Sequence, residues 1–290
     1  MTELTLNRIS YVYSEGTPFC HRALDDVNLT IRGGVITGLM GHTGSGKSTL
    51  VQLLNGLLKP KTGEILIDGK NIWDDPKQIR QIRFRVGLVF QYPEYQLFEE
   101  TVAKDIAFGP ANMGLPPEEI DRRTREAMRF VGLGDEYLEK SPFDLSGGQK
   151  RRVAVAGVMA MEPEILILDE PAAGLDPMGR EEILGGIHSY QRRVGNTVII
   201  VSHSMEDMAR YADRLVVMQN GSVAADGTTA EIFRNTELLA STGLDVPQIT
   251  RLCRSLREKG LPLPQDLYTV EAARHAICEL YRNRRGGTEQ

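Results

Sequence analysis

The sequence predicts an α/β fold around a buried, largely parallel sheet. Two apolar, β-favouring runs at residues 165–168 and 197–201 are separated by a segment long enough for a helix, as parallel βαβ units require. A third apolar run at residues 35–40 leads through a glycine-rich loop into leucines at helical spacing. The main domain is therefore expected to combine a sheet with covering helices.

The other elements of the main domain follow in chain order. Residues 4–13 and 23–31 alternate or cluster β-favouring residues, and turn residues lie between them, which predicts two strands at the start of the chain. From residue 94 to about residue 160, Pro and Gly punctuate several short helical patterns, among them residues 117–132. We interpret this stretch as a helical insertion.

The pattern changes again after about residue 236. Apolar residues at helical spacing in 249–256 and a second helical stretch at 269–281 flank a break that contains Gly and Pro. We therefore expect a main domain over residues 1–235 and a small helical extension over residues 236–290. Residues 282–290 are expected to form a frayed tail.

Composition and charge exclude some classes of function. The chain has 34 basic and 39 acidic residues, a formal net charge of −5, so it lacks the cationic field that draws proteins onto nucleic acid, and we expect no nucleic acid partner. Its apolar stretches are shorter than the roughly 20 residues that cross a bilayer, so a membrane role requires a membrane-spanning partner. Cys20, Cys253 and Cys278 form no CxxC pair, and we expect buried or half-buried thiols in a reducing cytosol.

The glycine-rich loop carries the pattern GxxxxGK[ST] between an expected strand and an expected helix. It consists of Gly41, His42, Thr43, Gly44, Ser45, Gly46, Lys47, Ser48 and Thr49. Glycines let backbone N–H groups converge on phosphate oxygens, and a helix N-terminus adds partial positive charge. Lys47 would bridge the β- and γ-phosphates of a nucleotide, and Ser48 would complete a Mg²⁺ shell. The alternative is a strand-to-helix turn without a ligand.

Two carboxylates end the apolar run at residues 165–168, where parallel sheets place their ligands. Successive side chains on a strand point in opposite directions, so Asp169 and Glu170 should have different roles. Asp169 can hold Mg²⁺ through its water shell, and Glu170 can orient and polarise the water that attacks a γ-phosphate. Alternatively, Glu170 is a charged strand end before the turn at Pro171.

Residues 145–149 have the sequence Leu-Ser-Gly-Gly-Gln and precede an expected helix from Lys150 onward. A serine and two glycines at this place form a second anion-binding helix end, made of exposed N–H groups and a hydroxyl. Two phosphate-binding helix ends about a hundred residues apart indicate one nucleotide held by two molecules. The alternative is a simple helix N-cap.

With this motif, residues 1–235 resemble the ABC ATPase family. The resemblance implies a P-loop NTPase core of the RecA-like type, with an N-terminal antiparallel β subdomain and an inserted α-helical subdomain. It also implies ATP and Mg²⁺ as cofactors. Tyr13 matches the aromatic residue that stacks on adenine, although Tyr11 is close enough to leave the choice open. Gln91 matches the glutamine that links the Mg²⁺ site to the helical subdomain, and His203 the histidine that contacts the γ-phosphate.

The family pattern further implies a head-to-tail dimer that ATP closes and hydrolysis reopens. Asp176 matches an aspartate at the dimer interface, although in isolation it could cap the helix that begins near Pro177. The residues expected to reach the nucleotide of the opposite subunit are Ser146, Gly147, Gly148 and Gln149. The catalytic set expected within one subunit is Lys47, Gln91, Glu170 and His203.

Several stretches resemble the ATPase subunits of energy-coupling factor (ECF) importers, most closely the second of two paralogous ATPases. They include residues 41–44, 90–102, 105–109, 170–176, 242–248 and 256–260. The resemblance implies a peripheral protein on the cytoplasmic face of the cell membrane, bound to a shared transmembrane coupling subunit. That subunit accepts small substrate-binding membrane proteins for vitamins or for cobalt or nickel ions. The ATPase partner is an identical chain or a paralogue, and the likeness favours a paralogue. The C-terminal helices are expected to add a dimer contact.

The segment after Gln91 is too apolar for a free loop. Its apolar residues, Tyr92, Pro93, Tyr95, Leu97 and Phe98, would suit a groove that receives a partner's helix. Alternatively, they pack into the helical insertion itself.

Three other functions compete with import. A soluble ABC ATPase usually has two fused cassettes or a long coiled coil, and this chain shows neither. An ATP-gated scaffold without turnover would not need both Glu170 and His203. An exporter ATPase shares the same catalytic motifs, and only the segment at 91–109 and the C-terminal extension favour import. The sequence does not indicate the cargo, because no residue is expected to contact it.

Overall fold

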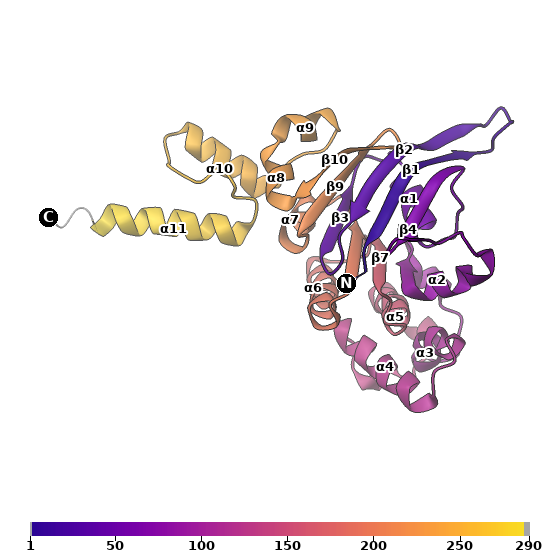
Figure 1. The fold of residues 1–290 in the computed structure, drawn as a ribbon. Helices are drawn as coiled ribbons and strands as arrows, with labels where there is room; N and C mark the ends of the chain where they lie inside the picture. Colours follow the sequence, from indigo (N-terminus) through magenta and orange to yellow (C-terminus); the bar gives the residue numbers. More distant parts are fainter. Residues whose placement is uncertain (1, 287–290) are drawn as a thin grey trace.

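The computed structural model describes residues 2–286, and the α/β fold class is confirmed (Figure 1). An antiparallel sheet of order β2-β1-β4-β5 comes first. Its strands are β1 (Leu4–Tyr13), β2 (His21–Ile31), β4 (Thr62–Ile67) and β5 (Lys70–Asn71). The two strands expected at the start of the chain therefore form half of this sheet.

A second sheet has the order β10-β9-β3-β8-β7-β6 and is parallel except for the edge strand β10. Its strands are β3 (Ile36–Met40), β6 (Val86–Val89), β7 (Ile165–Asp169), β8 (Thr197–Val201), β9 (Arg214–Gln219) and β10 (Ser222–Thr228). The predicted parallel pairing of the runs at 165–168 and 197–201 is confirmed, because β7 and β8 are direct neighbours.

Successive residues of the central strands face two different hydrophobic cores. Ile165 and Ile167 pack with the helix α1 (Lys47–Leu54) and the antiparallel sheet. Leu166 and Leu168 pack on the other face, with the helical insertion and with α6 (Pro177–Val194). This alternation buries the parallel sheet on both faces, as its continuous apolar strands require. Two shorter helices, α2 (Ile79–Arg85) and α7 (Met205–Tyr211), complete the main layers.

The helical insertion consists of three helices with short 3₁₀ turns around them. The helices are α3 (Val102–Asn112), α4 (Pro117–Phe130) and α5 (Gly147–Met159). α4 is attached to α6 by close backbone packing, because a Cβ on Gly186 would clash with the carbonyl oxygen of Phe130. The Phe130 ring also packs edge-to-face on Tyr190, with centroids 5.2 Å apart. The insertion lies at the lower side of the molecule in Figure 1.

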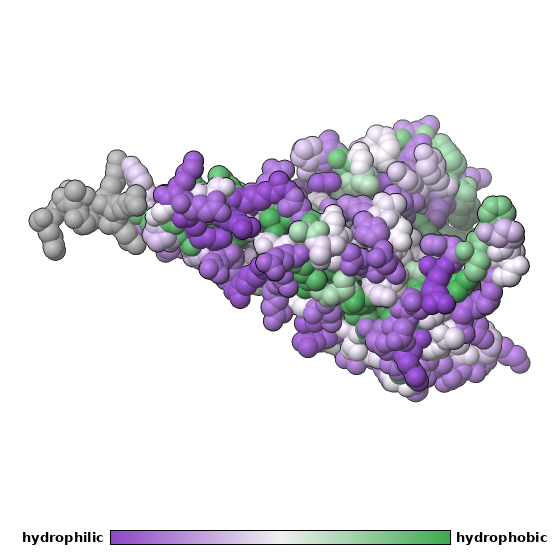
Figure 2. Space-filling view, turned by 90° about the horizontal axis from the view of Figure 1, so that it is seen from above, coloured by the Kyte–Doolittle hydropathy of each residue, from purple (hydrophilic) through white to green (hydrophobic). Residues whose placement is uncertain are grey.

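Of the C-terminal helices, the first two lie against the body and the last two form an arm that projects from it (Figure 1). They are α8 (Thr229–Arg234), α9 (Thr236–Ser241), α10 (Gln248–Glu258) and α11 (Val270–Gly286). Leu239 of α9 packs in the main core, whereas α10 and α11 enclose a small core of their own around Cys253 and Leu267. The arm's surface in Figure 2 is mostly hydrophilic.

Two expectations need correction. α11 continues through Gly286, so residues 282–286 are helical and not frayed, and residues 287–290 lie outside the described part. Cys253 is buried as expected, but Cys20 and Cys278 are exposed because they lie at the β1–β2 turn and on the outer face of α11. In the described part, no helix combines the length and apolar character needed to cross a membrane.

Candidate active site

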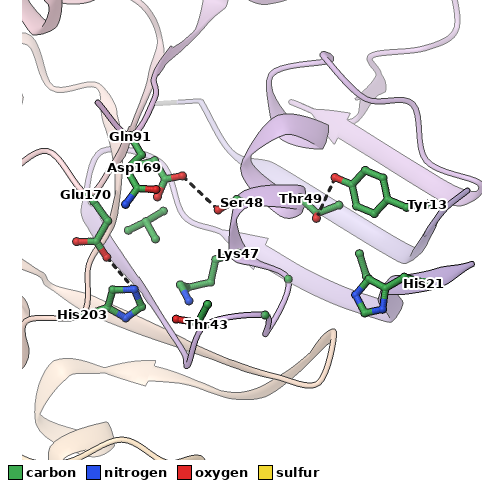
Figure 3. Close-up of a pocket in the computed structure, with 14 residues that line it drawn as sticks. Tyr13, His21, Thr43, Lys47, Ser48, Thr49, Gln91, Asp169, Glu170 and His203 are labelled. Atoms are coloured by element: carbon green, nitrogen blue, oxygen red, sulfur yellow. Dashed lines mark hydrogen bonds and ion pairs between the residues drawn. The ribbon is translucent and has the colours of Figure 1, made fainter. Parts of the chain in front are cut away.

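A cavity of about 270 Å³ lies at the carboxyl ends of the parallel strands (Figure 3). β3 leads into the phosphate loop, β7 ends at Asp169, and β8 leads to His203. The carboxyl ends of parallel strands meet at one sheet edge, so residues far apart in sequence come together here. The predicted residues that line the cavity are Tyr13, Thr43, Gly44, Gly46, Lys47, Ser48, Thr49, Gln91, Asp169, Glu170 and His203.

The phosphate loop contains backbone conformations that favour glycine. Gly44 and Gly46 have φ values of +82° and +102°, which side chains rarely adopt. A Cβ on Gly46 would also lie 2.6 Å from the carbonyl oxygen of Ala23. α1 begins at Lys47 without a side-chain N-cap, so its first N–H groups are available to an anion. The loop therefore fits phosphate oxygens.

Lys47 is held inside this loop. Its side chain is buried, and Nζ donates hydrogen bonds to the carbonyl oxygens of Gly41 at 2.6 Å and His42 at 2.9 Å. Burial lowers the pKa of Lys47, and the nearby Glu170 and Asp169 carboxylates partly oppose this. Gly41, His42 and Ser45 do not line the cavity, and their oxygen atoms contact Lys47 Nζ within the loop. The ammonium is thus positioned for an anion entering the cavity.

Ser48, Asp169 and Gln91 bring three oxygen-bearing side chains to the cavity (Figure 3). Ser48 Oγ donates a hydrogen bond to Asp169 Oδ2 at 3.3 Å. Burial raises the pKa of Asp169, while Ser48 and Lys47 favour its ionised form. Among the described residues there is no group of three or more His, Cys, Asp or Glu that could hold a metal. A small set of hard oxygen ligands nevertheless fits Mg²⁺, which keeps several waters and binds substrate phosphates.

Glu170 has the chemistry of a general base. Its φ is +52°, a strained value for a side chain with a Cβ. Its Oε1 is buried and makes no hydrogen bond, although it lies 3.2 Å from His203 Nε2. Burial, and then the Asp169 charge, raise the pKa of Glu170 to about 7. Burial and the Lys47 charge lower the pKa of His203. A carboxylate with an unused acceptor can take a proton from a water near neutral pH.

The other end of the cavity is aromatic. The Tyr13 hydroxyl lies 3.2 Å from Thr49 Oγ1, within hydrogen-bond distance. Tyr11 packs edge-to-face against Tyr13 and belongs to the core, so Tyr13 is the tyrosine that faces the cavity. Three residues that sequence reasoning missed also line it, namely His21, Ala23 and Val201. No sequence signal identified His21, because its direct pairing with Tyr13 depends on the register of the hairpin.

The remaining predicted residues lie around a second cavity of about 590 Å³, which shares no lining residue with the first. Ser146, Gly148, Gln149 and Asp176 line it. The helix α5 begins at Gly147, not at Lys150 as expected, because Ser146 and Gln149 form a reciprocal capping box. Asp176 caps α6 by accepting a hydrogen bond from the N–H of Gly179 at 2.7 Å. The structure therefore separates these residues from the phosphate loop of the same chain.

The apolar segment after Gln91 is partly buried and partly exposed. Pro93 is buried and Leu97 packs against the core, as the alternative interpretation expected. Tyr92, Tyr95 and Phe98 are exposed, and Phe98 packs edge-to-face on the exposed Phe108 of α3, with centroids 4.9 Å apart. We call these four exposed residues, Tyr92, Tyr95, Phe98 and Phe108, the aromatic patch.

Known proteins resemble this chain over most of its length. Residues 24–173 match the family model described as ABC transporter. The chain is 54% identical over 279 residues to the energy-coupling factor transporter ATP-binding protein EcfA2 of Caldanaerobacter subterraneus subsp. tengcongensis, covering 96% of this chain and 98% of that relative. This alignment must include most of the C-terminal extension.

Solved structures show the same architecture. The structure of cbiO1 from Clostridium perfringens, part of the ABC transporter complex cbiONQ, matches with a TM-score of 0.74 and 40% identity, over 88% of this chain and 98% of that chain. A dimeric ATP-binding cassette in a post-hydrolysis state, bound to ADP and Pi, matches with a TM-score of 0.71 and 30% identity, over 78% of this chain and 98% of that chain.

Proposed function

The chain belongs to the ABC transporter family, and from that membership we propose that it is the ATP-hydrolysing subunit of an ECF-type importer for vitamins or transition-metal ions. The observation that carries the proposal is the presence of two separate half-sites in one chain. The first contains the phosphate loop and Glu170, and the second contains Ser146 and Asp176. A nucleotide held in the first half-site of one chain can be covered only by the second half-site of another chain. ATP-driven closure of a dimer follows from this arrangement.

Each residue of the first half-site has a role in hydrolysis that its surroundings support. Lys47 and the N–H groups of the loop bind and orient the phosphates. Glu170 accepts the proton of the attacking water, and its buried Oε1, which makes no hydrogen bond, is the atom suited to this task. Desolvation and the Lys47 charge lower the pKa of His203, which favours the neutral ring, and one nitrogen of that ring can donate a hydrogen bond to the γ-phosphate.

Ser48, Asp169 and Gln91 would hold Mg²⁺, directly or through its water shell. When bound, this ion would supply positive charge that offsets the negative charge of the phosphates. Asp169 also raises the pKa of Glu170, since two neighbouring carboxylates resist ionising together. With the charge of Asp169 neutralised, Glu170 would ionise more readily and so be available to accept a proton.

The aromatic patch is the surface that we assign to the transmembrane coupling subunit. The exposed fractions of Tyr95 and Phe98 are 85% and 58%, which is unusual for neighbouring aromatic residues on a protein surface. An amphipathic helix of a membrane partner can cover such a patch. Because Tyr92 follows Gln91 directly, docking of a partner on the patch can change the position of Gln91 in the ATP site. The protein would then lie peripherally on the cytoplasmic face of the membrane.

Two further partners complete the proposal. The second ATPase is an identical chain or a paralogue, and the family likeness favours a paralogue. The C-terminal arm exposes Leu252 and Val270, which supports a second dimer contact between the extensions. Small substrate-binding membrane proteins would join through the coupling subunit and select the cargo.

Purification from the native host tests this assignment. The tagged chain is extracted from membranes in mild detergent, and mass spectrometry identifies what accompanies it. We expect a second ATPase of similar size, a polytopic membrane protein and small hydrophobic proteins. The double variant Tyr95→Ser, Phe98→Ser should no longer co-purify with the membrane proteins but should keep its own ATPase turnover. The control Phe19→Ser, at a phenylalanine of the β1–β2 turn that is 83% exposed, should keep both. Recovery only from the soluble fraction, or with ribosomes or DNA, would refute the transport role.

A further inference from the structure

The aromatic end of the first half-site contains a residue that hydrolysis does not use. His21 of β2 lines the cavity beside Tyr13, on the far side of the phosphate loop from Glu170 and His203 (Figure 3). A triphosphate whose last phosphate lies at Glu170 extends along the loop toward this end. The nucleoside therefore comes to the place where Tyr13 and His21 lie.

The hairpin register pairs the two residues directly. Tyr13 and His21 are directly paired residues of the antiparallel strands β1 and β2. Side chains of directly paired residues project from the same face of a sheet, with Cβ atoms about 4.5–5.5 Å apart. Tyr13 is fixed in position, because Thr49 lies within hydrogen-bond distance of its hydroxyl and the Tyr11 ring packs against it. His21 thus places a second ring at the same end of the cavity as the fixed ring of Tyr13.

We propose that His21 is a specificity-determining residue, which forms with Tyr13 a two-ring platform that favours purine over pyrimidine nucleotides. A purine has two fused rings and can contact both side chains, whereas a pyrimidine covers only one of them. Stacking of a base on an aromatic side chain tolerates different bases, so the number of rings in contact decides the preference. The inference rests on the nucleotide site proposed above and adds its base selectivity.

Binding of ADP and CDP, each with Mg²⁺, to the full chain tests the proposal without hydrolysis. Calorimetry is carried out on the parent, His21→Ala, His21→Phe and Arg22→Ala. Arg22 is the matched control, because it is the next residue of β2, does not line the cavity and pairs with Asp25 at 2.9 Å. From the usual cost of losing one stacking partner, His21→Ala should weaken ADP binding about fivefold to tenfold and CDP binding less than about twofold.

The other variants separate stacking from other effects. His21→Phe should keep the ADP affinity of the parent within about twofold, since it keeps an aromatic ring, and Arg22→Ala should change neither nucleotide. Turnover at saturating ATP should stay at the parental level in Arg22→Ala, because Arg22 does not line the cavity. Equal loss of ADP and CDP binding in His21→Ala, or no loss, would overturn the platform. A parent chain that binds neither nucleotide would refute the nucleotide site itself and this inference with it.

Discussion

A buried ion pair holds the segment that follows Gln91 against the helix α5. Arg151 of α5 donates hydrogen bonds from Nε and Nη2 to the two carboxylate oxygens of Glu94, at 3.0 and 3.2 Å. Its guanidinium also lies 5.7 Å from the centre of the Tyr92 ring. The side chain of Arg151 is 4% exposed and that of Glu94 is 18% exposed. The pair therefore connects the ATP site, the aromatic patch and the Ser146 half-site.

The unequal exposure of the two partners gives unequal costs for removing them. Glu94→Leu leaves a buried guanidinium without its carboxylate, which should lower the free energy of unfolding by about 3–5 kcal/mol. Arg151→Met leaves a carboxylate that water can reach, so its cost should be smaller, about 1–3 kcal/mol. The double variant removes both charges and fills the space with apolar atoms. Its stability should lie within about 1 kcal/mol of the parent.

Urea unfolding followed by far-ultraviolet circular dichroism measures these differences. Arg125→Met is the control, because Arg125 makes comparable ion pairs with Asp121 and Asp135 on an exposed surface of α4. Exposed pairs contribute about 0–1 kcal/mol, so this variant should be nearly as stable as the parent. The reasoning fails if Glu94→Leu costs no more than Arg125→Met, or if the double variant costs the sum of the two single changes.

Three further predictions concern the nucleotide site. Glu170→Gln should lower kcat at least about 100-fold while ADP still binds, and turnover near the parental rate in a steady-state ATPase assay would remove Glu170 as the base. In the nucleotide-free protein the pKa of Glu170 is raised to about 7, so its protonated form stabilises the fold at low pH and this stabilisation is lost as pH rises through about 7. Glu170→Gln should therefore raise the melting temperature more at pH 8 than at pH 5.5, and an equal gain at both values would contradict the shift. Gly46→Ala should abolish ADP binding and lower the melting temperature, because its Cβ would meet the Ala23 carbonyl, whereas Gly147→Ala should leave melting unchanged and impair only turnover by the dimer. Parental ADP affinity in Gly46→Ala, or parental turnover in Gly147→Ala, would refute these roles.

Patterns that are local in sequence predicted much of the fold. The strands β7 and β8 were expected almost at their observed bounds, since each is a short apolar run, and Asp169 and Glu170 at the end of β7 reach the cavity as expected. The strands β9 and β10 were not expected, although Asn220 and Gly221 between them form a strong hairpin signal.

Pairings between distant segments could not be predicted in the same way. β4 follows α1 in sequence but pairs with β1, which no local pattern indicates. β6 has only four residues, too few for a clear periodicity. The role of His21 depends on the register of a hairpin that contains irregularities between Leu6 and Val12, so its place beside Tyr13 required the structure.

The motif at residues 145–149 can act both as a helix cap and as a binding site for a phosphate. Ser146 does cap α5, and its Oγ accepts a hydrogen bond from the N–H of Gln149 at 3.3 Å. An accepting hydroxyl still has its own proton, which can be donated outward to a phosphate oxygen. Gly147, the first residue of α5, has a negative φ, and a Cβ on it would meet no atom of this chain within 4 Å. Folding of the chain therefore does not require glycine there, whereas the proposed function gives it a role, because a nucleotide held by a second chain would approach the backbone closely. The helix cap fixes the position of the Ser146 hydroxyl, and the bare backbone at Gly147 leaves room for the ligand.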